Sequence, residues 1–183
     1  MTDKLIKQSP FIRCGEINLR ALTFDDVRQP YLDWLNDSDV LKWRGPKAFP
    51  KVVGDIEQYI SSVRDQSQLV LAIEETATKK HLGNISLAHI QWVHRNAEIN
   101  IMIGDADVRG RGLGGVAIKA LAAHAFNNMG LHRVWAESPN PAFNATVAKL
   151  GWQKEGTKRE AFLVDGKLVD ITCWSLLSTD QIR

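Results

Sequence analysis

A cluster of glycines and arginines is the part of the sequence whose residue types most directly suggest a binding chemistry. Residues 108–116 read Val-Arg-Gly-Arg-Gly-Leu-Gly-Gly-Val, with four glycines within six positions. Glycines lack Cβ atoms, so the main-chain N–H groups of this segment, the glycine loop, can line a concave surface. A helix predicted over residues 112–129 would add its unpaired N-terminal amides. With the charges of Arg109 and Arg111, the loop predicts a phosphate-binding site. The alternative is a helix start that needs only close packing.

The same glycines also allow an interpretation as a dinucleotide-binding loop. Gly110, Gly112 and Gly115 match the spacing G-x-G-x-x-G, and Glu137 lies near the distance expected for a ribose-binding acid. The context argues against this interpretation, because the loop comes late in the chain and leaves too little sequence to complete a doubly wound sheet. The strands predicted before the loop also look like hairpins. A phosphate site of another kind is therefore favoured.

The elements that must position the glycine loop are predicted from hydrophobic periodicity. Alternation of polar and apolar residues predicts strands, and apolar residues three or four positions apart predict helices. Pro30 lies inside the first helical pattern, which we expect to bend or restart there. Asp165-Gly166 predicts a tight hairpin turn. The predicted strands are residues 16–22, 69–73, 82–93, 98–103, 133–138, 161–164 and 168–174, and the predicted helices are residues 24–35, 52–65, 112–129 and 141–150. This order predicts a single mixed α/β or α+β domain, residues 1–183, built on one central sheet.

Composition excludes several classes of protein. Lys and Arg number 23 and Asp and Glu number 21, so the net charge of +2 gives no general attraction to nucleic acid. We find no apolar run of about 18 residues that could span a membrane. Residues 1–8 contain no apolar segment typical of a secretory signal. Cys14 and Cys173 lie far apart without metal-ligand spacing, so we expect a cytoplasmic protein with no metal site.

Three motifs in sequence order resemble one known family. Arg109-Gly110-Arg111-Gly112-Leu113-Gly114 resembles the R/Q-x-x-G-x-G/A signature of the GNAT superfamily of acyl-CoA-dependent N-acetyltransferases. Residues 97–105 resemble the strand before that signature, and Asn140 followed by residues 149–156 resembles the family's later N…K-L-G-F-x-x-E-G motif. The resemblance covers residues 16–177. It is strongest with the branch that contains ribosomal-protein N-terminal and amino-sugar acetyltransferases.

The resemblance implies the GNAT fold, with acetyl-CoA as co-substrate and no metal. In that fold a V-shaped opening separates the strand ending near Ile103 from the strand at residues 134–138. Splayed strands expose unpaired N–H and C=O groups, which the amide-rich pantetheine arm can satisfy, and the diphosphate would bind the glycine loop. The cofactor-binding residues implied are Ile101, Ile103, Val108, Arg109, Gly110, Arg111, Gly112, Leu113, Gly114, Gly115, Val116, Asn140, Asn144 and Lys149.

Two residues are the catalytic candidates. Glu98 aligns with a carboxylate that several relatives use as base, although a strand glutamate is commonly a solvated outward residue. Asn140 could hold pantetheine or a water, or could cap the helix that begins at Pro141. A main-chain N–H near residues 101–103 would stabilise the developing oxyanion. The tyrosine that serves many relatives as acid is replaced by Val147, so water or the product ammonium would protonate the thiolate.

The resemblance implies that the acceptor is a primary amine. The candidate substrate-binding residues are Trp34, Trp43 and Arg44. Arg44 could hold a carboxylate or phosphate of the acceptor, or could simply be solvated. We expect a small molecule such as an amino sugar, with protein N-terminal acetylation as the alternative. A non-catalytic acyl-CoA-binding module is a further alternative, because of Val147. Relatives often dimerise through the C-terminal strands, which leaves a homodimer open.

Overall fold

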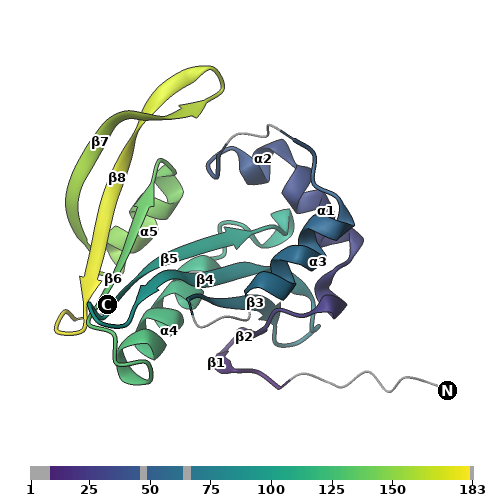
Figure 1. Cartoon of the computed structure of the whole chain (residues 1–183), viewed down its shortest axis with the longest axis horizontal. Coiled ribbons are helices and arrows are strands. Elements are labelled where there is room, and N and C mark those ends of the chain that lie inside the picture. The colour runs from purple at the N-terminus through teal and green to yellow at the C-terminus, as the bar shows by residue number, and fades with distance from the viewer. Residues whose placement is uncertain (1–8, 46–48, 64–66, 182–183) are drawn as a thin grey trace.

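The protein is built on one eight-stranded sheet with the strand order β1-β2-β3-β4-β5-β6-β8-β7 (Figure 1). The structure, a computed structural model, describes residues 9–45, 49–63 and 67–181. Residues 1–8 and the end of the helix predicted over residues 52–65 lie outside the described residues. The strands are β1 (Ile12–Cys14), β2 (Ile17–Ala21), β3 (Leu69–Glu75), β4 (His81–Gln91), β5 (Asn96–Ile103), β6 (Arg133–Ser138), β7 (Gln153–Val164) and β8 (Lys167–Leu177). The predicted mixed α/β architecture is confirmed.

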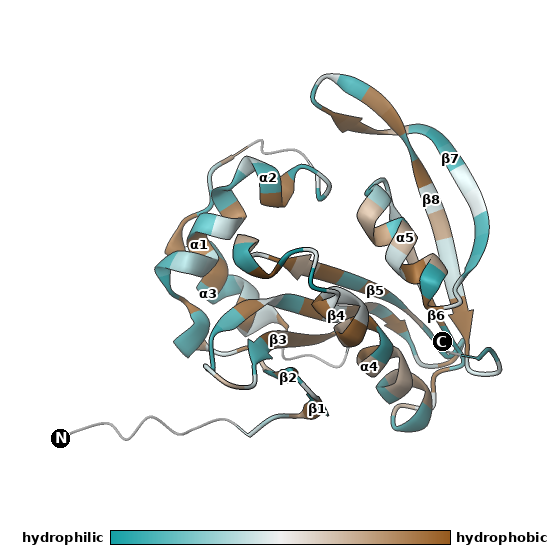
Figure 2. Cartoon of the chain, turned by 180° about the vertical axis from the view of Figure 1, so that it is seen from behind, coloured by the Kyte–Doolittle hydropathy of each residue, from teal (hydrophilic) through white to brown (hydrophobic). Residues whose placement is uncertain are grey.

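Helices cover both faces of the sheet, and each face has its own core. On one face, α4 (Leu113–Asn127) and α5 (Pro141–Lys149) pack on the strands, as the view from behind shows for α4 (Figure 2). On the other face lie α1 (Gln29–Asn36), α2 (Ser38–Leu41) and α3 (Val53–Ser62). The alternation along β3 explains the division, because Leu71 and Ile73 belong to the first core and Val70 and Ala72 to the second.

The sheet opens between β5 and β6, the one parallel pair among the described strands. These strands pair only between residues 96–98 and residues 133–135, and they then diverge (Figure 1). The rest of β6 pairs with β8 on its other side, and the rest of β5 pairs with β4. The predicted splayed sheet is therefore confirmed, and the ends of β5 and β6 leave an opening in front of α4.

A few elements differ from their predicted form. The short edge strand β1 was not predicted. The helix predicted over residues 24–35 splits into a 3-10 turn, Phe24–Asp26, and α1, which restarts at Gln29 and carries Pro30 in its first turn. The C-terminal hairpin is longer than predicted, but its turn is as expected, since Asp165 and Gly166 have φ values of +48° and +77°. No helix in the described ranges is long and apolar enough to cross a membrane.

Candidate active site

A cavity of about 550 Å³, the large cavity, lies in the opening between β5 and β6. The glycine loop and the start of α4 form one wall, and the start of α5 forms another. The segment around α2 closes the third side. Its lining residues are Asp39, Val40, Trp43, Arg44, Ile101, Met102, Ile103, Val108, Arg109, Gly110, Gly112, Leu113, Gly114, Gly115, Ile118, Ser138, Asn140, Ala142, Phe143 and Thr146.

The main chain of the glycine loop offers donors to this cavity. Gly110 and Gly112 both have φ of +80°, and no atom lies within 4 Å of the place where a Cβ would stand. The amides of Arg109, Arg111, Gly115 and Val116 donate to acceptors within the turn, whereas no such main-chain bond uses the amides of Gly110, Gly112, Leu113 and Gly114 within the described chain. The N–H groups of Gly112, Leu113 and Gly114 lie at the start of a 15-residue helix, where the helix dipole also favours an anion, and that of Gly110 lies in the loop just before it. The site therefore suits a diphosphate.

The edge of β5 supplies further main-chain groups. Gly104 N–H donates to Leu82 O, and in an antiparallel ladder such bonds recur at every second residue. The polar groups of Ile101 and Ile103 therefore point away from β4, into the opening. Arg44 Nη1 donates to Ile101 O at 3.0 Å, and Arg109 Nε donates to Ile103 O at 3.3 Å.

A second cavity of about 260 Å³, the small cavity, lies on the opposite face of the sheet beneath α1 and α3. It combines an apolar floor with polar side chains from neighbouring strands. Its lining residues are Tyr31, Leu35, Arg44, Lys51, Asp55, Ile56, Tyr59, Val70, Asn84, Ile85, Ser86, Asn100, Ile101 and Met102. Burial raises the pKa of Tyr31 and, to a smaller degree, that of Tyr59, so both hydroxyls stay protonated at neutral pH.

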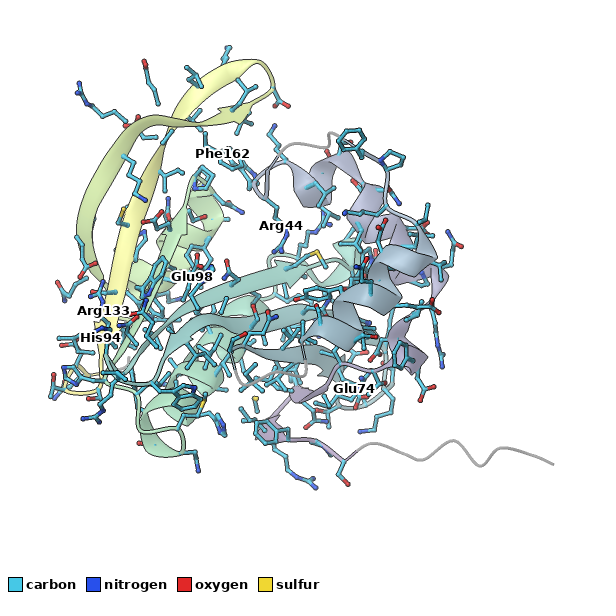
Figure 3. The ribbon with its side chains drawn as sticks, viewed as in Figure 1. Arg44, Glu74, His94, Glu98, Arg133 and Phe162 are labelled. Carbon is cyan, nitrogen blue, oxygen red and sulfur yellow. The ribbon has the colours of Figure 1, made fainter. Side chains whose placement is uncertain are left out.

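The two cavities meet at three shared residues, Arg44, Ile101 and Met102. A ligand in one cavity can therefore reach a ligand in the other beside the end of β5. Arg44 keeps accessible surface but is surrounded by protein atoms, and this desolvation lowers its pKa from the ordinary value. The guanidinium remains a cation at neutral pH. Figure 3 shows Arg44 above β5 near α2, at the open end of the strand.

Comparison with known proteins decides the family. Residues 16–153 match the family model described as "Acetyltransferase (GNAT) domain". The chain belongs to the GNAT acetyltransferase family. This confirms the resemblance drawn from the glycine loop and the later motifs. The enzyme is an acetyl-CoA-dependent N-acetyltransferase.

Several relatives of this GNAT enzyme cover most of its length. It is 25% identical over 173 residues to "Uncharacterized N-acetyltransferase YoaA" of Bacillus subtilis, which covers 92% of this chain and 97% of the relative. It is 24% identical over 172 residues to a spermidine N(1)-acetyltransferase of Vibrio cholerae, and this match also covers 92% of this chain and 97% of the relative. The crystal structure of spermidine N-acetyltransferase from Vibrio cholerae in complex with CoA and spermine has a TM-score of 0.81 at 23% identity, covering 90% of this chain and 96% of that one.

The structure gathers most of the predicted cofactor-binding residues in the large cavity. Asn140 lies in its wall and also caps α5, since its Oδ1 accepts from the amide of Ala142 at 2.9 Å. Trp43 and Arg44, predicted to bind substrate, also line it. The predicted cofactor-binding residues in the wall are Ile101, Ile103, Val108, Arg109, Gly110, Gly112, Leu113, Gly114, Gly115 and Asn140. Within the described ranges, no group of three His, Cys, Asp or Glu side chains could hold a metal ion.

Four predicted cofactor-binding residues lie outside the wall. Arg111 points toward the start of β2 and the end of β3, where its guanidinium is 3.4 Å from the Glu16 carboxylate and 3.7 Å from the Glu75 carboxylate. Asn144 is held by Trp174 Nε1, which donates to its Oδ1 at 2.9 Å. Val116 and Lys149 are exposed on the outer sides of α4 and α5. Helix geometry explains the positions of Val116, Asn144 and Lys149, because only part of each helix surface faces the opening.

Three other predicted residues also lie away from both cavities. Trp34 is buried in the second core, where its ring packs against Gly104 and His81. Val147 lies on the fully buried side of α5, and the side chains of this helix that face the large cavity are Ala142, Phe143 and Thr146. Glu98 lies nearer the end where β5 pairs with β6 (Figure 3), and its Oε2 is 3.6 Å from His89 Nε2.

Most of the small cavity was missed by the sequence analysis. Tyr31 and Tyr59 come from two helices, and Asn84, Ser86 and Asn100 come from two strands. The strand residues carry the one signal that could have revealed them. Polar residues alternate there with buried Ile85, Leu87 and Ile99, which indicates that the second face of these strands is partly polar.

Proposed function

We propose that this GNAT enzyme acetylates the primary amine of a small molecule whose body occupies the small cavity, while acetyl-CoA occupies the large cavity. The observation that carries the proposal is the meeting of the two cavities at Arg44, Ile101 and Met102. Direct transfer in a ternary complex requires such a junction, because the nitrogen must approach to within about 3–3.5 Å of the reacting carbon.

On the cofactor side, the chain's own contribution is binding and orientation. The four available amides of the glycine loop and the Arg109 guanidinium would hold the diphosphate. The edge of β5 at Ile101 and Ile103 would pair with an amide-rich arm, in place of part of the arginine contacts it now makes. Acetyl-CoA supplies the thioester whose acetyl group is transferred.

On the acceptor side, the enzyme must favour a neutral nitrogen. A cation fixed beside the amine disfavours the ammonium form, and Arg44 is placed to exert this effect at the junction. During transfer the carbon–sulfur bond breaks and a carbon–nitrogen bond forms, and the proton lost by nitrogen ends on the thiolate. The thiolate is a tolerable leaving group, because a thiol has an ordinary pKa near 8.5. Water can therefore deliver the proton to it.

A small acceptor is supported by the dimensions and walls of the small cavity. At about 260 Å³ it is bounded by α1, α3 and strands β3–β5, and a protein N-terminus would need a long groove instead. An amino sugar, the acceptor expected from sequence, remains one candidate. The homodimer that the resemblance leaves open stays a prediction.

The test is release of free thiol from acetyl-CoA with four classes of acceptor. These are amino sugars, amino acids, polyamines and peptides with free N-termini, and mass spectrometry of the product identifies the acetylated nitrogen. We expect turnover with at least one small-molecule class and at most slow turnover with the peptides. Turnover with peptides alone would overturn the proposal. Tight binding of acetyl-CoA without turnover on any amine would instead indicate a non-catalytic module.

A further inference from the structure

Arg44 is a cation in the active site for which the described part of the chain supplies no carboxylate partner. Its hydrogen bond is to a main-chain carbonyl, Ile101 O, and no acidic side chain lies within 4.0 Å among residues 9–45, 49–63 and 67–181. Arg20, in contrast, is buried against two acids, with Asp26 and Glu74 both at 2.7 Å. A guanidinium has five N–H donors, so Arg44 retains donors for a ligand.

The charge around the small cavity is positive overall. Lys51 lines the same cavity, and Asp55 is the one acid among the lining residues that the structure describes. Asp55 Oδ2 already accepts from the amide of Val52 at 2.9 Å, which caps α3. In a partly enclosed cavity two cations against one engaged acid attract an anionic group and repel a polycation.

The remainder of the small cavity is apolar. Leu35, Ile56 and Val70 lie in its wall together with the ring of Tyr59. Ile56 and Val70 are buried, with 1% and 7% of their surface exposed. A ligand that places an aliphatic or aromatic group there removes apolar surface of both the ligand and the cavity from water.

From these observations we infer that the acceptor is a 2-amino carboxylate with an apolar side chain, and that Arg44 binds its carboxylate. The inference rests on the proposed function. The amine must reach the junction where Arg44 lies, so the anionic group that Arg44 binds must be within one or two bonds of the carbon bearing the amine. An α-carboxylate meets this requirement, and a planar carboxylate matches the guanidinium fork. The side chain would then enter the apolar part of the small cavity.

Other acceptors fit these features less well. Spermidine, the acceptor in the printed name of the Vibrio cholerae relative, is a polycation with no carboxylate for Arg44 and would meet a second cation at Lys51. Glucosamine has no anionic group. Glucosamine 6-phosphate has one, but several bonds separate its phosphate from the amine. These three compounds and a 2-amino carboxylate differ in the feature that Arg44 would recognise.

The experiment compares L-leucine with L-leucinamide, which differ in the carboxylate. The ratio of their kcat/KM values is measured in the wild type and in Arg44→Gln, with spermidine, glucosamine and glucosamine 6-phosphate in parallel. A charge-assisted hydrogen bond predicts that the ratio falls by about 10- to 100-fold in Arg44→Gln. Arg44→Lys should recover part of it. Within one enzyme, the ratio of the two kcat/KM values cancels any effect of the substitution on folding or on acetyl-CoA binding. Comparison of that ratio between the wild type and Arg44→Gln cancels the different basicities of the two amines.

Arg13→Gln is the matched control. Arg13 is exposed on the edge strand β1 and lines neither cavity, so the ratio should equal that of the wild type. The inference is overturned by a ratio that does not change in Arg44→Gln, or by a preference for spermidine or glucosamine. Arg44-dependent preference for glucosamine 6-phosphate would also overturn it, because the anion would then be a phosphate. If no amine of any class is acetylated, the proposed function fails instead.

Discussion

The large and small cavities meet at Arg44, but they are built from different parts of the polypeptide. The large cavity presents main-chain groups, from four amides of the glycine loop to the edge of β5. The small cavity presents side chains from two helices, three strands and the segments between them. A main-chain site depends on backbone conformation and on the absence of Cβ atoms. A side-chain site depends on which residue stands at each position and on the core that supports it.

This difference assigns separate tasks to the two cavities. Coenzyme A is common to the whole family, and a main-chain site can be kept while most side chains vary. The acceptor differs between relatives, and a site made of side chains can change with it. Substitutions in the two regions should therefore separate acetyl-CoA affinity from acceptor selection, and a substitution in the support of one cavity should leave the other intact.

Gly104→Ala should have the largest effect, because it removes the support of the small cavity. A Cβ at residue 104 would overlap the ring of Trp34, which belongs to the core beneath α1. Overpacking of this kind costs typically 1–3 kcal/mol, and we expect about 3 kcal/mol of the free energy of unfolding. Urea denaturation measures it. Gly114→Ala is the control, since its nearest neighbour would be Ile101 Cδ1 at 3.7 Å and no loss is expected. Equal stability of the two variants would contradict the packing argument.

Gly112→Ala tests the main-chain site, with Gly130→Ala as its matched partner. Both glycines have positive φ, +80° and +69°, and neither Cβ would meet an atom within 4 Å. Each alanine should cost about 1–2 kcal/mol of stability through backbone strain. Only Gly112 lines the large cavity, so only Gly112→Ala should weaken acetyl-CoA binding, by about tenfold or 1.4 kcal/mol. Isothermal titration calorimetry on both variants measures their affinity for acetyl-CoA. Equal affinities would show that the loop amides do not bind the diphosphate.

The same difference explains what the sequence could predict. Four glycines in six positions are a local signal, so the glycine loop and its place before a helix could be read directly from residues 108–116. The hairpin turn at Asp165-Gly166 is equally local. The small cavity carries no local signal, since it forms only when α3 packs across β3–β5 and brings Tyr59 near Tyr31.

Two predicted binding residues, Trp34 and Arg111, line neither cavity, and tertiary contacts explain where they lie. Trp34 was expected to bind substrate, but the missing Cβ of Gly104 lets its ring enter the core. Arg111 was expected to bind phosphate, but Glu16 and Glu75 lie on its other side and pair with it. In both cases the partner is distant in sequence from the residue itself. Spacing and composition cannot supply that information.

The pH dependence of stability tests a buried histidine that supports the small cavity. Beneath the small cavity, His81 Nε2 lies 2.8 Å from Asn84 Oδ1, and its ring packs against Tyr31. Burial lowers the pKa of His81 despite the neighbouring Asp26, so the unfolded chain takes up this proton at a higher pH than the folded protein. The stability contributed is present above the ordinary value of 6.5 and is lost as the pH falls through it.

Urea denaturation between pH 8 and pH 5 measures this effect. The free energy of unfolding should fall below pH 6.5 with a slope of at most about 1.4 kcal/mol per pH unit, the limit for one proton. His81→Gln should flatten that part of the curve. His94→Gln is the control, because His94 is exposed at the β4–β5 turn (Figure 3) and should leave the slope unchanged. Identical curves for the wild type and His81→Gln would contradict the assignment.

Glu98→Gln should have the smallest effect, although Glu98 was the candidate base from sequence. Its side chain lines neither cavity and lies beside β6, where the strands are still paired. A general base contributes about 10²–10⁴-fold to the rate, and it must reach the proton directly or through one water. We expect kcat with the best amine to fall less than about threefold, and the pH dependence of kcat/KM to keep its shape. Glu57→Gln, on the exposed side of α3, is the matched control. A hundredfold loss of kcat with disappearance of the acid limb of the profile would place the base at Glu98 after all, and catalysis would then depend on a side chain beyond both cavities.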